Sequence, residues 1–202
     1  MVPRCRRYDL LAGLFDYPDE ECQAKLQRCA GALADGYAGP AVLLEPLLEK
    51  VRELSVEQAQ EMFTRTFDIN PVCTLEIGWH IYGEDYARGA FLVKMREQLR
   101  EWNLPESREL PDHLTHVLAL LGRLEGEAAD QLAARYILPA LEKMLDGMKD
   151  SDSPYKEILQ AVSQVVGQDH DVEVVAPQQR RSEPPGWGAR LPIFNAQGRA
   201  GT

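Results

Sequence analysis

The sequence predicts an all-α protein, a single-domain bundle of about eight or nine helices over residues 5–167, followed by an irregular C-terminal tail. Two observations predict this fold. Apolar residues recur along most of the chain with the i, i+3, i+4, i+7 spacing of a helix that buries one face. No stretch alternates apolar and polar residues between strand-connecting turns, except residues 171–175, which are short and have no partner.

Four apolar stripes carry this prediction. Each one is a helix face that must be buried against another element, so together they indicate a bundle. In chain order the stripes are Phe91, Met95, Leu99 and Trp102; Leu114, Val117, Leu118 and Leu121; Leu132, Tyr136, Ile137, Ala140, Leu141, Met144, Leu145 and Met148; and Ile158, Leu159, Val162, Val165 and Val166.

Several residues predict helix boundaries. Pro18, followed by three acidic residues, has the pattern of a first helical turn. Residues 55–58, Ser-Val-Glu-Gln, have the form of a capping box. Pro46 and Pro139 interrupt helical patterns, and each is expected to kink or split its helix. Gly83 is expected to end one helix, and Gly89, inside the next, indicates close helix–helix contact.

The composition changes near residue 168, which divides the chain into a helical domain over 1–168 and a Pro/Gly-rich, flexible tail over 169–202. The tail holds four basic and four acidic residues, so the net charge of −10 lies on the helical body. Trp187, Leu191, Ile193 and Phe194 are apolar exceptions in it. The tail is either inert, or it docks on the domain itself or on a partner. In an alternative function, the protein is an acidic scaffold whose tail makes the functional contacts through Trp187 and Phe194.

Charge and cysteine content exclude several classes of protein. A pI of about 4.9 argues against nucleic acid or anionic lipid as partner and favours positively charged partners. The apolar stretches are too short for a membrane span or a secretory signal. The four cysteines show no C-x-x-C pair and no zinc-ligand spacing, which is typical of a reducing compartment. The sequence therefore predicts a cytoplasmic protein without direct membrane insertion.

The common catalytic motifs for nucleotides, ester hydrolysis and zinc proteolysis are absent from the sequence. Glu76–His80 and Glu109–His113 are carboxylate–imidazole pairs at i, i+4, and His116 lies one turn further. Helical di-iron proteins use an i, i+3 spacing, so this pattern disfavours a metal site. A helical metalloenzyme built on these side chains remains the alternative function.

Two local features suggest a binding site. The first is residues 108–114. In one interpretation Pro111 begins a helix, and Glu109 and Asp112 lie near the positive end of its dipole. In the other, Asp112 and His113 line a groove between helices and contact a ligand. Beside two carboxylates, the pKa of His113 is expected to be raised. Asp68 ends a helix against the dipole, so it is expected to have a cationic or N–H partner, with Asn70 or a neighbouring arginine as the simplest.

These features occur in the same order in a known family. Phe63-Thr64-Arg65-Thr66-Phe67-Asp68 resembles the Y-T-x-L-F-D stretch of the NarJ-type molybdenum cofactor assembly chaperones of respiratory nitrate reductase, which are related to the TorD/DmsD chaperones. Residues 83–89 resemble their H-G-[DE]-x-x-x-R-G segment, residues 109–114 match E-L-P-D-H-L, and the segment from Leu10-Leu11 to Tyr17-Pro18 resembles L-L-x-Y-P. The resemblance covers about residues 8–165.

The resemblance implies an all-helical binding protein that is not an enzyme and is not part of the final complex. Such proteins bind the N-terminal segment of the apo catalytic (alpha) subunit of a molybdoenzyme and assist insertion of the molybdenum bis(guanine dinucleotide) cofactor into that client. No cofactor or metal is expected to be held stably by the chaperone, and molybdenum cofactor biosynthesis proteins are further expected partners. Carried over by position, the client groove consists of Asp112, His113 and Glu109, with Asp68, Trp79, Tyr82 and Arg88 as further wall residues.

Overall fold

The computed structural model describes residues 2–105 and 107–170, and these fold into helices without strands. The predicted all-α class is confirmed. From residue 171 on, the predicted tail lies outside the described residues, as does the alternating run 171–175. The elements are α1 Arg4–Ala12, η1 Gly13–Phe15, α2 Cys22–Leu33, α3 Ala38–Val42, α4 Glu45–Glu53, α5 Val56–Phe63, η2 Thr64–Asp68, α6 Ile77–Tyr82, α7 Tyr86–Glu101, α8 Leu114–Leu121, α9 Gly126–Leu132, η3 Ala133–Ile137, α10 Leu138–Gly147 and α11 Tyr155–His170.

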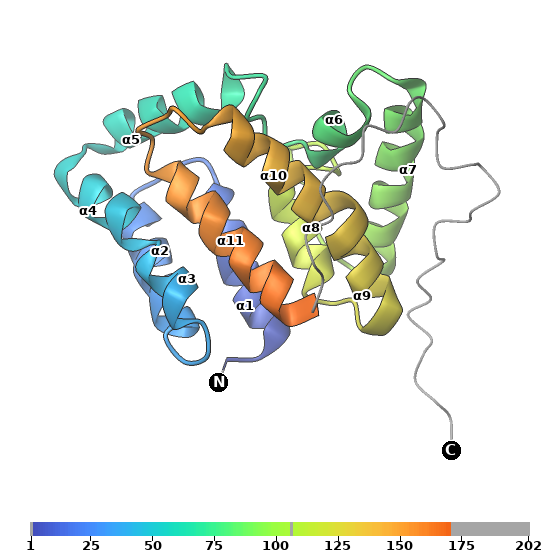
Figure 1. Ribbon diagram of the computed structural model, residues 1–202, viewed down its shortest axis with the longest axis horizontal. Helices are drawn as coiled ribbons and strands as arrows, with labels where there is room; N and C mark the ends of the chain where they lie inside the picture. Colours follow the sequence, from blue (N-terminus) through green and yellow to red (C-terminus); the bar gives the residue numbers. More distant parts are fainter. Residues whose placement is uncertain (1, 106, 171–202) are drawn as a thin grey trace.

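The helices form a bundle with α1, α8, α10 and α11 in the middle (Figure 1). Helix α1 packs along α8, although the two are far apart in the sequence, and α11 packs along α10, which directly precedes it in the chain. Helices α2 to α4 flank one side, and α6, α7 and α9 flank the other (Figure 1). None of the helices in the described ranges combines the length and the apolar character that a membrane span requires.

The predicted apolar stripes supply the core. Leu114, Val117 and Leu118 of α8 are fully buried, as are Ile158 and Val162 of α11. Burying one such side chain contributes roughly 1.5–3 kcal/mol relative to leaving it in water. Two stripe residues, Trp102 and Leu145, are only partly buried and pack at the edge of the core.

The boundary predictions had mixed outcomes. The capping box is confirmed, because the Ser55 hydroxyl accepts from the Gln58 amide and the Gln58 side chain accepts from the Ser55 amide. Pro139 lies in the first turn of α10, directly after the π-helical turn η3, so it does divide the helical pattern. The prediction for Pro18 was wrong: α2 begins at Cys22, since the Asp19 carboxylate forms a local turn by accepting from the Glu21 amide.

The glycines correct one expectation. Gly83 ends α6 with a φ of +59°, as its place in the sequence predicted. Gly89 was expected at a helix contact, but it is exposed, and a Cβ placed there would meet nothing within 4 Å. Gly78 in α6 is closely packed instead, because a Cβ there would lie 2.5 Å from the Asp112 carboxylate.

Candidate functional site

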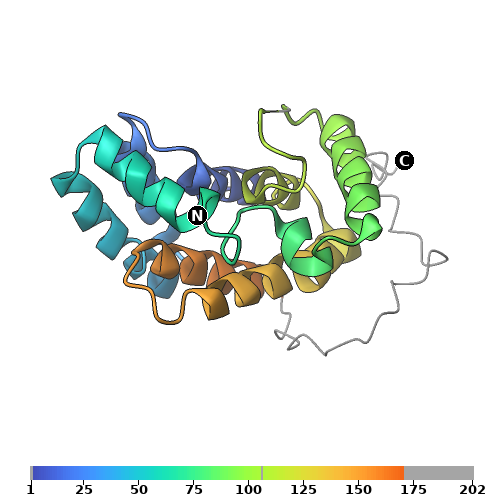
Figure 2. The same cartoon turned by 90° about the horizontal axis from the view of Figure 1, so that it is seen from above.

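A groove of about 850 Å³ opens between four segments, one of which is the stretch 74–76 that leads into α6. The other three are the chain just after α1, the end of α5 with η2, and the loop that leads into α8 together with the first turn of α8. Figure 2 looks onto α5 and that loop. We call this cavity the aromatic groove; it is lined by Phe15, Asp16, Tyr17, Phe63, Phe67, Asp68, Thr74, Leu75, Glu76, Pro105, Ser107, Arg108, Glu109, His113, Thr115 and His116.

The floor of the aromatic groove is a cluster of edge-to-face rings. Phe63 and Phe67 lie one turn apart with ring centroids 5.0 Å from each other, and Phe15 lies 6.1 Å from Phe67. Tyr155, the first residue of α11, packs behind them at 5.7 Å from Phe63. Such contacts add about 0.5–1.5 kcal/mol per pair beyond the area that they bury. The floor is therefore a rigid apolar surface.

The rim of the groove is acidic. Asp16, Asp68, Glu76 and Glu109 contribute carboxylates, and Arg108 is the one lining residue with a permanent positive charge. A concave surface with charges of one sign focuses the electrostatic potential and attracts ligands of the opposite sign. The arrangement suits a ligand that is both apolar and basic.

Asp68 finds its partner locally. The Thr64 hydroxyl, four residues earlier in η2, donates to Asp68 Oδ2 over 2.9 Å. The expectation of a cationic or N–H partner, or of Asn70, was therefore wrong. The hydroxyl satisfies one lone pair only, and the side chain is exposed on the groove wall, so the carboxylate remains accessible to a ligand.

His113 lies on the groove wall and caps α8. Its Nδ1 accepts from the Thr115 hydroxyl over 2.8 Å and from the Thr115 amide over 3.4 Å. Helix α8 therefore begins at Leu114, and the prediction that Pro111 is its first residue was wrong. Burial lowers the pKa of His113 to about 4, which outweighs the raising effect of Glu76 and corrects the expected upward shift. The ring is neutral, with its proton on Nε2.

His116 lies beside His113, with the ring centroids 6.3 Å apart. Its Nδ1 donates to the Leu110 carbonyl oxygen over 2.9 Å, and its Nε2 forms a hydrogen bond with the Ser107 hydroxyl over 3.1 Å. These bonds attach the loop before α8 to the helix. They position Arg108 and Glu109, which lie between the two anchored loop residues, on the rim.

Asp112 lies beneath the groove wall and has no exposed surface. Its Oδ2 accepts from the Gly78 amide over 3.1 Å and lies 3.5 Å from Arg88 Nε, while its main-chain oxygen accepts from the Ile77 amide over 3.0 Å. Burial raises the pKa of Asp112, and the Arg88 guanidinium opposes that rise. The carboxylate thus joins the start of α6 to the start of α8. It does not itself line the groove.

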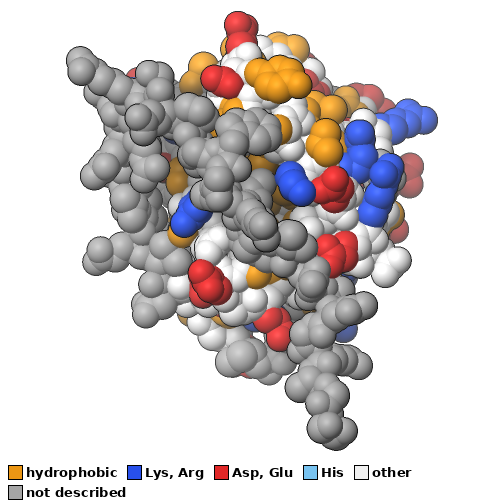
Figure 3. Space-filling view, turned by 90° about the vertical axis from the view of Figure 1, so that its right-hand side faces the viewer, with side chains coloured by type: hydrophobic (Ala, Val, Ile, Leu, Met, Phe, Trp, Pro, Cys, Tyr) orange, Lys and Arg blue, Asp and Glu red, His pale blue; other side chains and the backbone are white. Residues whose placement is uncertain are grey.

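Trp79 and Tyr82 lie around a second, shallower depression of about 510 Å³, which also includes Lys143. Arg88 lies under the Trp79 ring, 5.6 Å from its centroid. Of the seven residues predicted for the site, the structure brings Asp68, Glu109 and His113 together in the aromatic groove and leaves the other four outside its lining. The side of the molecule that Figure 3 shows carries hydrophobic, basic and acidic side chains close together.

The side chains of the alternative metal site point to other partners. Glu76 accepts from the Thr74 hydroxyl, and His80 Nε2 donates to the Thr74 main-chain oxygen over 2.7 Å. Within residues 2–105 and 107–170, no group of three or more His, Cys, Asp or Glu side chains is arranged to hold a metal ion.

The aromatic floor was not singled out as a site by sequence reasoning. Phe63 and Phe67 were noted as an i, i+4 pair, but Phe15 and Tyr17 belong to a different segment. One signal could have connected the two groups. Phe15 and Tyr17 lie in the L-L-x-Y-P opening, and Phe63 and Phe67 lie in another segment in which the chain resembles the same family.

A model of the family described as nitrate reductase delta subunit matches residues 30–159, well over half of the chain. The chain belongs to the nitrate reductase delta subunit family. The match includes the α5–η2 segment, the loop before α8 and the whole of α8, so most of the groove lies within the family's shared region.

A curated relative supports this membership. A protein of Bacillus subtilis (strain 168) named "Probable nitrate reductase molybdenum cofactor assembly chaperone NarJ" is 28% identical over 156 residues. The alignment covers 75% of this chain and 83% of the relative. The similarity therefore extends over most of both proteins and is not confined to the short motifs.

Proposed function

We propose that this member of the delta subunit family is a nitrate reductase molybdenum cofactor assembly chaperone, and that it binds the N-terminal segment of the apo catalytic subunit in the aromatic groove. The observation that carries the proposal is the pairing of a rigid aromatic floor with a rim of four carboxylates against one arginine. Family membership and the name of the Bacillus subtilis relative support the wider role.

The groove suits an amphipathic segment in two separable ways. Apolar side chains of the client would pack on Phe15, Phe63 and Phe67, which supplies most of the binding free energy. Basic side chains of the client would lie near Asp68 and Glu109, which speeds encounter and selects the charge sign more than it increases affinity. A segment held in this way cannot pack prematurely against the rest of the client.

The predicted site residues then divide by role. Asp68, Glu109 and His113 contact the client, and neutral His113 offers its Nε2 proton as a hydrogen-bond donor. Asp112 and Arg88 are positioning residues, because their ion pair holds the two helix starts that bring His113 and Glu76 to the wall. Trp79 and Tyr82 form a separate surface, available to a client segment that extends beyond the groove.

The molybdenum bis(guanine dinucleotide) cofactor belongs to the client in this proposal, and the chain's contribution is to keep the client receptive while the cofactor is inserted. Binding and release by the groove need no bond to be made or broken in the chaperone. We place this activity in the cytoplasm, before the complex assembles, with cofactor biosynthesis proteins as further partners. No structural observation favours the alternative of a metalloenzyme over this function.

The test is calorimetric titration of a synthetic peptide with the N-terminal sequence of the catalytic subunit into the full chain. We expect micromolar or tighter binding. Glu109→Lys should weaken it by about 3- to 10-fold at low salt, since a favourable charge contact at a groove rim becomes repulsive. The matched control is Glu49→Lys, an exposed residue on α4 outside the groove, which should change the affinity less than 2-fold.

The salt dependence separates this mechanism from a general charge effect. The difference between the Glu109 variant and the wild-type protein should shrink as salt is raised, because an exposed rim charge is screened. If the folded protein gives no heat with the peptide, or if both charge reversals weaken binding equally, the groove is not the client site.

A further inference from the structure

The C-terminal segment of the chain has the chemistry that the aromatic groove suits. Residues 186–202 contain Arg190 and Arg199 and no acidic residue, in a chain whose net charge is −10. The same segment carries apolar anchors, Trp187, Leu191, Ile193 and Phe194. The segment is thus apolar and basic, which is the combination that the aromatic floor and the four rim carboxylates favour.

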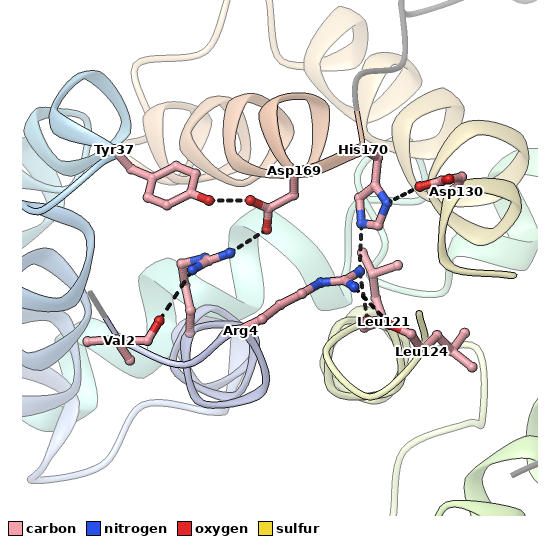
Figure 4. Close-up of polar contacts among 9 residues, drawn as sticks. Val2, Arg4, Tyr37, Leu121, Leu124, Asp130, Asp169 and His170 are labelled. Carbon is pink, nitrogen blue, oxygen red and sulfur yellow. Dashed lines mark hydrogen bonds and ion pairs between the residues drawn. The ribbon is translucent and has the colours of Figure 1, made fainter. Parts of the chain in front are cut away.

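The last described residues before this segment, Asp169 and His170, are fixed to the body of the protein. Asp169, near the end of α11, forms an ion pair with Arg7 over 2.7 Å, with side chains only 8% and 6% exposed. His170 Nδ1 donates to Asp130 over 2.7 Å, and its Nε2 lies 3.0 Å from an Arg4 nitrogen. Figure 4 shows these contacts between α1, α9 and the end of α11. The chain therefore leaves the body from a defined place.

The groove lies at the other end of the same helix. Tyr155, the first residue of α11, packs against Phe67 at 5.0 Å and against Phe63 at 5.7 Å, and both rings form the groove floor. A helix of 16 residues is roughly 24 Å long, at about 1.5 Å per residue. The aromatic groove is therefore about one helix length away from His170.

The connecting residues have the right length for this distance. Residues 171–186 lie between His170 and the first anchor, Trp187. A flexible chain of that length has a root-mean-square span of roughly 20–24 Å, and fully extended it reaches roughly 53 Å. The effective concentration of a tethered segment is greatest when the span of the tether matches the distance, and it is then in the millimolar range.

We propose that residues 186–202 occupy the aromatic groove when no client is present, and that the client's N-terminal segment displaces them. This inference rests on the proposed function of the groove. Residues 186–202 act as an internal competitor. They shield the aromatic floor from nonspecific contacts, and a client's N-terminal segment must bind the groove more tightly in order to displace them. With an intrinsic dissociation constant near ~0.1 mM and an effective concentration near ~1 mM, the competition weakens client binding about tenfold.

The test uses the full chain throughout. Trp187→Ala combined with Phe194→Ala removes the two largest anchors, and Asn195→Ala combined with Gln197→Ala is the matched control in the same segment. In calorimetry, the client peptide should bind the anchor variant about tenfold more tightly than the wild-type protein, and the control variant should bind like the wild type. A synthetic peptide of residues 184–202, titrated into the anchor variant, should bind and should be displaced by the client peptide.

The outcomes separate this inference from the proposed function. Equal client affinity in the wild-type protein and the anchor variant would overturn the competition while leaving the chaperone function intact. A 184–202 peptide that binds but is not displaced by the client peptide would also overturn it. Binding of the 184–202 peptide to the groove, lost in Glu109→Lys, together with no binding of any client peptide, would support the docking and refute the proposed function.

Discussion

Gly78 and Gly89 provide a pair of identical substitutions for which the structure predicts opposite effects on stability. Both glycines lie in helices, α6 and α7 respectively. A Cβ at Gly89 would meet nothing within 4 Å, whereas a Cβ at Gly78 would lie 2.5 Å from Asp112 Oδ2 and 3.0 Å from the Phe91 ring. The buried carboxylate cannot keep its place against such a contact.

The magnitudes follow from what each substitution adds and removes. Alanine in the exposed helix interior should stabilise the protein by about 0.8–1 kcal/mol over glycine. At position 78 the gain is offset by the loss of a hydrogen bond to a charged acceptor, about 1.5–3 kcal/mol, and by a shift of Phe91 that costs about 1 kcal/mol. We expect Gly78→Ala to be destabilising by about 2 kcal/mol net.

Thermal unfolding followed by far-ultraviolet circular dichroism measures the Tm of both variants. Gly89→Ala should raise the Tm by about 2–4 °C and Gly78→Ala should lower it by about 4–8 °C, from the usual relation of 2–4 °C per kcal/mol in proteins of this size. Gly78→Ala should also weaken binding of the client peptide, since Asp112 holds the segment that presents His113. Shifts of the same sign in the two variants would refute the assignment of Gly78 as the close contact between α6 and the Asp112 carboxylate.

Two further predictions concern ionisable groups. Asp169→Asn leaves the buried Arg7 guanidinium without its charge partner and should destabilise the protein by about 3 kcal/mol in urea unfolding at pH 7. Burial alone would raise the pKa of Asp169, but hydrogen bonds from Tyr37 and Arg7 hold it below the usual value, so the wild-type protein should lose this stability below about pH 4 and the variant should show no such loss. Burial lowers the pKa of His113 to about 4. Between pH 6.5 and 4 this side chain is therefore protonated in the unfolded chain but remains neutral in the folded protein. Stability should fall by about 3 kcal/mol over that range, and His113→Asn, which keeps an N-cap acceptor, should remove most of the fall; an unchanged pH profile would contradict the burial of the ring.

The parts of the fold that the sequence predicted are those decided by neighbours along the chain. The stripe on α8 buries Leu114, Val117 and Leu118 as its period requires. The capping box at Ser55 forms because both of its hydrogen bonds join residues three apart. Gly83 ends α6 because glycine tolerates the positive φ that the helix end needs. None of these depends on a distant element.

Several of the errors came from contacts between distant segments. The pKa of His113 moved in the opposite direction from the prediction because neighbours along the chain suggested carboxylates, while the fold buries the ring. Gly89 and Gly78 are both helical glycines, and what distinguishes them is the position of Phe91 and of Asp112, which lies 34 residues from Gly78. The groove floor joins Phe15 to Phe63 and Phe67, and no local pattern reports such a contact.

The E-L-P-D-H-L segment gains a physical explanation from this arrangement. Its aspartate lies wholly inside the protein, accepts from the start of α6 and pairs with Arg88, so it cannot touch a client. Its histidine caps α8 and shows one edge of its ring to the groove, and its glutamate lies on the rim. The segment therefore combines one residue that sets the geometry with two that meet the ligand. An Asp112→Asn variant should weaken client binding through loss of that geometry, with little change in its salt dependence, whereas Glu109→Gln should reduce the salt dependence and leave stability nearly unchanged.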